Sequence, residues 1–240
     1  MIKVKNLTIE FENLKLFENV SFQIPKNKVT MIVGQNGTGK TTLLKTISKT
    51  ISPKGLELEN NSKGMFYLPQ KINYTKGLTL YEYLSSIFFK ENWKWYLSKD
   101  DKQIIEDNLE KLELLDKKNV LIENLSSGEL QKANIALGLI SNADLLLFDE
   151  PTSNMDLINQ IKILDIIKKL TQKDITSVII MHDINLSSSY GDYFIGVNPQ
   201  HKLMCANKDN FFTEKNLKDI YNIDFKVVNN EKDFYIQIFN

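Results

Sequence analysis

Residues 29–44 of the chain read Val29-Thr30-Met31-Ile32-Val33-Gly34-Gln35-Asn36-Gly37-Thr38-Gly39-Lys40-Thr41-Thr42-Leu43-Leu44. The first five are mostly apolar and β-branched, which predicts a short buried strand, and a helix is expected from Thr42 to about Thr50. Between them lies the pattern GxxxxGK[ST], typical of a glycine-rich loop that binds phosphate. An ordinary glycine-rich turn is the alternative interpretation. The strand before the loop and the helix after it favour phosphate binding, because the motif requires this structural context.

The residue types of this loop suit a bound phosphate. Glycines let successive backbone N–H groups face an anion, and the N-terminus of the following helix adds its partial positive charge. Lys40 would bring a positive charge to the β- and γ-phosphates of a nucleotide, and the Thr41 hydroxyl would ligate Mg²⁺. The nucleotide-binding residues expected here are Gly34, Gln35, Asn36, Gly37, Thr38, Gly39, Lys40, Thr41 and Thr42.

The composition is that of an ordinary globular protein, and it restricts the function. A chain of 240 residues forms one large domain or two small ones. Its formal net charge of zero provides no strong basic field for nucleic acid. All 30 basic residues are lysine, so the chain supplies no arginine finger. The single cysteine, Cys205, excludes an internal disulfide and fits a reducing cytosol.

The sequence also indicates how the chain would relate to a membrane. Its first residues, Met1-Ile2-Lys3-Val4-Lys5, do not form the apolar core of a signal peptide. No uninterrupted apolar run approaches the ~18 residues that span a bilayer. We therefore expect any membrane role to depend on a partner.

Alternating apolar residues predict two β-strands within residues 1–28 and two short strands around Leu56 and over residues 65–68. Phe11 lies at the end of the first of these strands, and its residue type alone favours packing in a core. Gln70 follows the strand over residues 65–68. Sheets of α/β proteins place ligand-binding groups at such carboxyl-terminal strand edges.

In the middle of the chain the apolar period changes from two to about 3.6, which predicts a helical region. Thr79 is expected to cap one helix, and Ser98 or Lys99 to start a second. Trp93 and Trp95 lie between these helices and belong either to a core or to a docking surface, with the core favoured.

The stretch Leu125-Ser126-Ser127-Gly128-Glu129 precedes a third helical pattern. A serine- and glycine-containing loop at a helix N-terminus is a second candidate anion site. By itself this is a weak signal.

Acidic and basic side chains follow two later buried strands. Asp149 and Glu150 end one apolar strand, and His182 ends the next. Asp149 would hold Mg²⁺ through water, and Glu150 would orient or deprotonate an attacking water. A solvated strand end is the alternative for the two acids, and it is weaker beside a phosphate loop whose threonine needs an acidic partner. His182 would donate to a γ-phosphate unless its role is structural.

The end of the chain is predicted to return to mixed secondary structure. Residues 192–207 form a further β segment, and a helix runs from Thr213 to about Tyr221. Residues 225–228 and 234–239 would close the chain as a hairpin with Asn229-Asn230 in its turn.

Taken in order, these motifs closely resemble those of the ABC-type ATPases, and the resemblance covers essentially the whole chain. Residues 34–42 resemble the Walker A motif of that family. Gln70 resembles its Q-loop glutamine, and residues 125–129 its LSGGQ signature. Phe11 falls where the family stacks an aromatic ring on adenine, which reverses the interpretation of Phe11 as a core residue.

The second half of the chain continues the resemblance. Residues 145–150 resemble Walker B with its catalytic glutamate, Ser153–Asp156 the D-loop, and His182 the switch histidine. Two departures stand out. Ser127 occupies the place of the usual signature glycine, where its hydroxyl either adds a phosphate contact or crowds one. The turn at Asn27 also lacks a usual glycine, although asparagine tolerates the left-handed conformation.

The resemblance implies an α/β fold, a P-loop NTPase (RecA-like) core with an antiparallel β subdomain and an inserted α-helical subdomain. Residues 1–71 and 141–206 would form the nucleotide-binding core with the β subdomain. Residues 72–140 would form the helical subdomain with the signature motif, and residues 207–240 a C-terminal extension.

The resemblance also implies a head-to-tail homodimer with two ATP molecules between its subunits. Each site would take Walker A, Gln70 and His182 from one chain, with Asp149 and Glu150 beside them. The other chain would supply its signature residues, Ser126, Ser127, Gly128 and Glu129. Mg²⁺ would be held by Thr41, Gln70 and Asp149, and the residues implied in catalysis are Lys40, Gln70, Glu150 and His182. ATP would close the dimer and hydrolysis would reopen it.

Within the family, softer patterns are similar to the ATPase subunits of iron–siderophore, haem and cobalamin importers. They include Tyr67-Leu68-Pro69-Gln70 and the tail Phe212–Asp224. Such a subunit works at the cytoplasmic face of the membrane with a permease and, indirectly, an extracytoplasmic binding protein. An exporter subunit and a non-transport ABC protein that acts on ribosomes or nucleic acid are the alternatives. The neutral charge argues against the latter, and the cargo cannot be read from the sequence.

Overall fold

A six-stranded sheet organises the computed structural model, which describes residues 2–11, 14–53, 56–92, 96–230 and 233–239. The strand order is β5-β6-β7-β3-β8-β9. The first five strands run parallel, and β9 is antiparallel to β8. Their bounds are Met65–Leu68 (β5), Leu145–Asp149 (β6), Thr176–Ile180 (β7), Val29–Gly34 (β3), Tyr193–Val197 (β8) and Leu203–Asn207 (β9). The β segment predicted over residues 192–207 is thus a hairpin of two strands.

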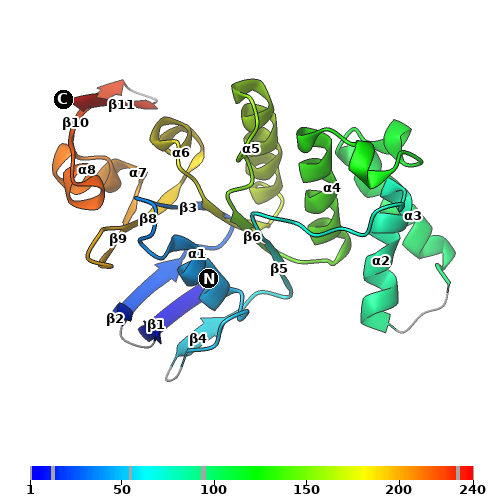
Figure 1. The fold of residues 1–240 in the computed structure, drawn as a ribbon, viewed down its shortest axis with the longest axis horizontal. Coiled ribbons are helices and arrows are strands. Elements are labelled where there is room, and N and C mark those ends of the chain that lie inside the picture. Colours follow the sequence, from blue (N-terminus) through cyan, green and yellow to red (C-terminus); the bar gives the residue numbers. More distant parts are fainter. Residues whose placement is uncertain (1, 12–13, 54–55, 93–95, 231–232, 240) are drawn as a thin grey trace.

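The central strands β3, β6 and β7 are buried along their whole length, as their apolar runs predict. Side chains alternate between two faces, so Met31 packs in one core and Ile32 in the other. One face is covered by α4, α5 and α6, and the opposite face by α1 and a small antiparallel sheet (Figure 1). The bounds are Lys40–Ile47 (α1), Ser127–Ile140 (α4), Leu157–Thr171 (α5) and Ile184–Tyr190 (α6). The predicted α/β P-loop NTPase fold is confirmed.

Helix α1 begins and ends earlier than the sequence pattern predicts. It starts at Lys40 rather than Thr42, directly after Gly39, whose backbone is left-handed at φ 98°. It ends at Ile47 rather than near Thr50. Lys49 takes a left-handed φ of 58°, and such a residue stops a helix.

The small antiparallel sheet has the order β2-β1-β4, with bounds Ile2–Phe11 (β1), Leu14–Ile24 (β2) and Glu57–Asn60 (β4). The strands β4 and β5 are neighbours in sequence but belong to different sheets. The chain therefore crosses from the antiparallel sheet to the main sheet between residues 60 and 65, and Gln70 follows the end of β5.

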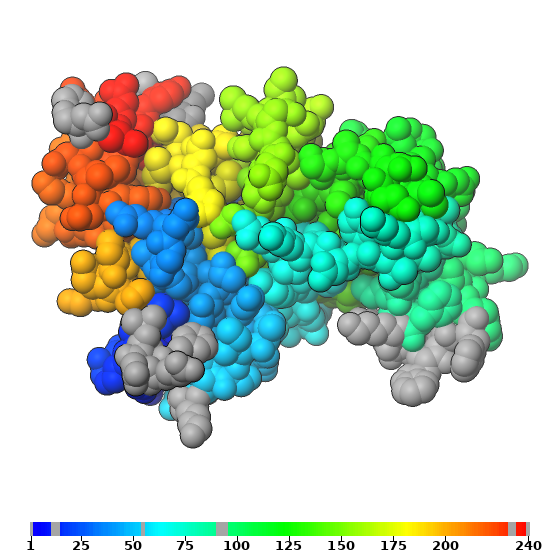
Figure 2. Space-filling view, in the orientation of Figure 1, coloured from blue at the N-terminus to red at the C-terminus, as the bar shows by residue number. Residues whose placement is uncertain are grey.

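The helical region lies at one end of the molecule and the C-terminal segments at the other (Figure 2). It contains α2 (Leu80–Asn92), α3 (Lys99–Lys111), the short 3₁₀ helices Leu115–Lys117 and Ile122–Asn124, and α4. The predicted caps are present: the Thr79 hydroxyl accepts from the Glu82 N–H, and the Ser98 hydroxyl from the Asp101 N–H. Trp93 and Trp95 lie outside the described residues. The boundaries of the predicted subdomains stay predictions.

The C-terminal segments are α7 (Lys208–Phe211), α8 (Glu214–Tyr221), β10 (Asp224–Asn230) and β11 (Asp233–Phe239). The hairpin is confirmed, but the turn predicted at Asn229-Asn230 is wrong. Asn229 pairs with Phe234 and Asn230 with Asp233, so the ladder continues through both asparagines. Among the described helices, none combines the length and apolarity needed to cross a bilayer.

Candidate nucleotide site

The loop between β3 and α1 has a backbone that requires glycine. Gly34 has φ 145°, and a Cβ there would lie 2.2 Å from the backbone oxygen of Val197. Gly39 has φ 98° and immediately precedes α1. An L-residue at either position would be strained, so the loop is shaped by the glycines that the sequence pattern singles out.

Lys40 is buried inside this loop, with 5% of its surface exposed. Its ammonium group donates to the backbone oxygens of Gly34, at 2.9 Å, and Gln35, at 2.7 Å. Burial lowers the pKa of Lys40 because it disfavours the charged form, while the nearby Glu150 and Asp149 carboxylates oppose that shift. The cation is therefore held within the phosphate loop rather than in solvent.

Asp149, at the end of β6, is contacted by two hydroxyl groups. The Thr41 hydroxyl donates to Asp149 Oδ1 at 3.0 Å, and the Tyr67 hydroxyl to Asp149 Oδ2 at 3.2 Å. Burial raises the pKa of Asp149, and these two hydrogen bonds counteract the shift. Thr41 and Asp149 thus bring a hydroxyl and a carboxylate oxygen to one point, a donor set that suits Mg²⁺.

Glu150 is held between two side chains from neighbouring strand ends. Gln70 Nε2 donates to Glu150 Oε2 at 2.5 Å, and His182 Nε2 lies 2.6 Å from Glu150 Oε1. Glu150 itself has a left-handed backbone at φ 52°, a conformation that costs a non-glycine residue free energy. The ends of β5, β6 and β7 therefore converge on one carboxylate, at the sheet edge where the sequence predicts ligand-binding groups.

One cavity of about 560 Å³ lies beside the loop, and both Lys40 and Glu150 line it. Half of the predicted site residues line it, and they are Asn36, Gly37, Gly39, Lys40, Thr41, Thr42, Gln70, Glu150 and His182, together with Leu16. Two other predicted residues, Gln35 and Thr38, bond to each other within the loop. The Thr38 hydroxyl donates to the Gln35 backbone oxygen at 3.0 Å. The side chain of Phe11 lies outside the described residues.

The signature residues lie outside the lining of this cavity. Ser126 caps α4, and its backbone N–H and hydroxyl donate to one oxygen of Glu129 at 2.9 and 2.8 Å. This capping box lowers the pKa of Glu129 through the hydrogen bonds from Ser126. Ser127 is exposed as the first residue of α4, and Gly128 follows it. Within a single chain, residues 126–129 therefore form a capped helix N-terminus that does not line the phosphate loop's cavity.

Ser127→Gly is expected to change ATP hydrolysis by less than about threefold. Ser126 and Glu129 make the cap, so a glycine at residue 127 leaves the start of α4 intact. If the Ser127 hydroxyl instead made a needed contact with a charged phosphate, losing ~1.5–3 kcal/mol would slow hydrolysis by ~10-fold or more. Steady-state rates at saturating ATP and Mg²⁺ measure this. A tenfold rise in the glycine variant would show that the serine crowds the site, contrary to our expectation.

Two tyrosines contact residues of the site, although no sequence motif predicted these contacts. Tyr67 reaches Asp149 because β5 pairs with β6 in a register that sets Tyr67 beside Leu147. Tyr221 ends α8, and its backbone oxygen accepts from the side-chain amide of Gln35. Burial raises the pKa of both tyrosine hydroxyls, and the Asp149 carboxylate adds to the shift at Tyr67. The end of α8 thus contacts the phosphate loop directly.

Comparison with known proteins identifies the class to which this fold and site belong. The family model described as ABC transporter matches residues 17–153, and the chain belongs to that family. It is an ATP-binding and ATP-hydrolysing subunit of the family.

Individual relatives cover nearly the whole chain. An uncharacterized ABC transporter ATP-binding protein of Methanocaldococcus jannaschii is 32% identical over 95% of this chain and 94% of its own. Two proteins of Bacillus subtilis are similar as well. The probable siderophore transport system ATP-binding protein YusV is 28% identical over 88% of this chain and 86% of its own. The iron(3+)-hydroxamate import ATP-binding protein FhuC is 29% identical over 95% of this chain and 90% of its own.

A solved structure supports the fold. A putative metal-chelate type ABC transporter in an inward-facing conformation contains a chain that superposes with a TM-score of 0.88. It is 24% identical in sequence, and the match covers 99% of this chain and 96% of that one.

Proposed function

We propose that this chain powers the import of an iron–siderophore complex, or of a similar chelate such as haem or cobalamin, through a membrane permease. The named relatives in Bacillus subtilis act in siderophore transport and iron(3+)-hydroxamate import, and they align with nearly all of this chain. The observation that carries the enzymatic part is that Lys40 and Glu150 line the same cavity, one to bind phosphate and one to act on water.

The proposed chemistry assigns one task to each side chain. Lys40 would transfer its hydrogen bonds from the loop carbonyls to the β- and γ-phosphates of ATP. Thr41, Asp149 and the Gln70 side-chain oxygen would hold Mg²⁺, which neutralises charge on the phosphate oxygens. Glu150 would take a proton from the attacking water as general base.

Gln70 and His182 would position that base. Both contact the Glu150 carboxylate, one at each oxygen, so its orientation is set by the ends of two neighbouring strands. His182 would also donate to the γ-phosphate once ATP is bound. Release of the cleaved phosphate would break its contact with His182. Hydrolysis would thereby be linked to a change of conformation.

We further propose a head-to-tail homodimer in which the signature of one chain completes the site of the other. The Ser126–Glu129 cap lies outside the cavity of its own chain and presents a helix N-terminus, an arrangement that suits a phosphate from a second subunit. Beyond the D-loop, Leu157 and Ile158 on α5 are 57% and 67% exposed. A second copy would cover these apolar side chains.

The remaining partners follow from the transport role. A permease would contact the surface near Gln70 and the helical region and would hold the chain at the cytoplasmic face of the membrane. An extracytoplasmic binding protein would deliver the cargo to that permease. No nucleic-acid partner is proposed, since the formal net charge is zero.

Reconstitution with a membrane permease of the iron–siderophore import class tests the proposal. The chain is expected to co-purify with that permease, and vesicles containing both should take up a ferric hydroxamate only when ATP is supplied on the chain's side. Vesicles with the Glu150→Gln variant serve as the inactive control. Export of the cargo, or association with ribosomes instead of the permease, would contradict it.

A further inference from the structure

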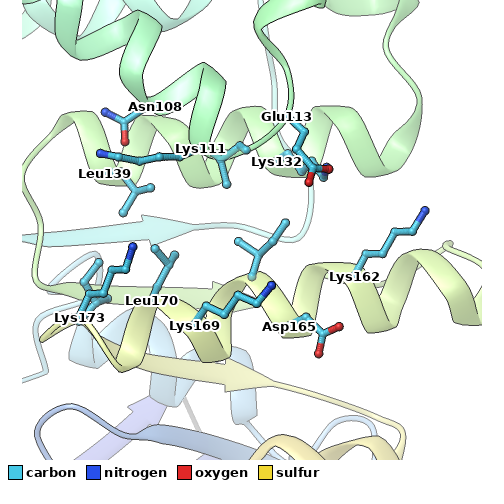
Figure 3. A pocket seen from close by; sticks show the side chains of 13 residues that line it. Asn108, Lys111, Glu113, Lys132, Leu139, Lys162, Asp165, Lys169, Leu170 and Lys173 are labelled. Atoms are coloured by element: carbon cyan, nitrogen blue, oxygen red, sulfur yellow. The ribbon is translucent and has the colours of Figure 1, made fainter.

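A second cavity, of about 600 Å³, is lined by residues between Asn108 and Ile175 and by none of the phosphate loop (Figure 3). One wall is formed by α3 and α4 of the helical region and the other by α5 of the sheet core. Five lysines line it, and we call it the lysine cavity: Lys111, Lys132, Lys162, Lys169 and Lys173. None of them belongs to the nucleotide site described above.

The charge around the lysine cavity is strongly unbalanced for a chain of zero net charge. Only two carboxylates line it, and both have other partners. Glu113 pairs with Lys132 at 3.3 Å, and Asp165 accepts a hydrogen bond from the Tyr190 hydroxyl at 2.8 Å. In the described part of the chain, the other four lysines have no carboxylate oxygen within 4.0 Å of their ammonium groups.

Helix electrostatics explains only part of this arrangement. Lys111 and Lys169 lie in the last turns of α3 and α5, where lysine is favourable beside unpaired backbone carbonyls. Lys162 lies in the middle of α5, so the unpaired carbonyls of a helix end do not explain a lysine there. The helix ends also do not account for the hollow that separates the lysine-bearing walls, which Figure 3 shows with Lys111 on one side and Lys169 on the other.

The apolar part of the cavity lining is aliphatic. It is made by Leu112, Leu139, Ile166, Leu170 and Ile175. No aromatic ring lies among the described residues that line it, so a nucleobase or an aromatic acid would find no stacking partner. The volume is that of a small-molecule site, in which an apolar lining is combined with a few charged groups.

We propose that the lysine cavity binds an amphiphilic anion, with an aliphatic chain against the aliphatic side chains of the lining and a phosphate or carboxylate head among the lysines. A dissolved single-chain compound and a lipid of the membrane share this chemistry. Because one wall belongs to the helical region and the other to the sheet core, the bound molecule bridges the two.

Calorimetric titration of the full chain with dodecyl phosphate, below its micelle concentration, tests the proposal. We expect saturable binding of one molecule per chain. Dodecyl maltoside, with the same alkyl chain and an uncharged head, and inorganic phosphate alone should each bind at least tenfold more weakly. Saturating ATP with Mg²⁺ should leave the affinity for dodecyl phosphate unchanged, because the two sites have separate linings.

Charge-removing variants locate the binding. The double variant Lys111→Gln, Lys169→Gln should bind dodecyl phosphate at least tenfold more weakly. The matched control Lys76→Gln, Lys102→Gln removes two exposed lysines outside the cavity and should bind as the unchanged chain does. Equal binding by both double variants, competition by ATP, or no saturable binding would each overturn the proposal.

Sedimentation with vesicles distinguishes a membrane lipid from a dissolved compound as the source of the anion. The vesicles contain phosphatidylcholine alone or with added phosphatidic acid. Sedimentation that requires phosphatidic acid and is lost in the Lys111→Gln, Lys169→Gln variant assigns the ligand to the membrane. Binding of dissolved dodecyl phosphate without such sedimentation assigns it to a soluble compound. Both results support an amphiphilic-anion site.

Discussion

Glu150→Gln is expected to lower steady-state ATP hydrolysis by about 10²–10⁴-fold, the typical contribution of a general base. The glutamine has nearly the same shape, and its side-chain oxygen can still accept from Gln70 Nε2, which donates to one carboxylate oxygen at 2.5 Å. Its NH₂ group takes the place of the other oxygen, which lies 2.6 Å from His182 Nε2. It cannot accept a proton from water. Binding of ATP should persist, because Lys40 and the phosphate loop are unchanged.

The loss of turnover should trap a dimer with ATP bound, which size-exclusion chromatography in the presence of ATP detects. Glu106→Gln is the matched control: it makes the same chemical change at a carboxylate that pairs with Lys118 at 2.9 Å, away from the cavity. That variant should hydrolyse ATP normally. A Glu150→Gln enzyme with the original rate would remove Glu150 from the role of base.

The sheet edge could be predicted because its information is local. The apolar runs that precede Gln70, Glu150 and His182 each predict a strand, and parallel strands bring their carboxyl ends to one edge. The structure indeed brings these three side chains into hydrogen-bonding contact. The phosphate loop is equally local, since its glycines are needed at positive φ.

Other features depend on contacts between distant segments and leave no local signal. Tyr67 reaches Asp149 only through the register of β5 on β6, and Tyr221 meets Gln35 only after α8 has folded back on the loop. The turn predicted at Asn229-Asn230 was wrong for the same reason. Asparagine favours turns, but the ladder from Asp224 to Phe239 continues through both residues and overrides that preference.

Lys40→Ala is expected to weaken ATP binding by about 10–100-fold. A hydrogen bond to a charged group is worth ~1.5–3 kcal/mol, and each 1.4 kcal/mol is tenfold in affinity. Lys40 is the side-chain cation of the loop, and its ammonium group now donates to the backbone oxygens of Gly34 and Gln35. Alanine removes the charge that the γ-phosphate requires and leaves both oxygens without this donor.

The experiment separates lost binding from lost folding. Calorimetric titration with ATP and Mg²⁺ gives the affinity, and the melting temperature without nucleotide reports the fold. Lys28→Ala, an exposed lysine just before β3, is the matched control and should bind ATP normally. Burial disfavours the Lys40 cation, as its lowered pKa reflects, but alanine also leaves the Gly34 and Gln35 oxygens without their donor, so the melting temperature measures any loss of folding. A Lys40→Ala protein with unchanged affinity and unchanged hydrolysis would refute the assignment, because no other side chain of the loop residues 34–42 carries a positive charge.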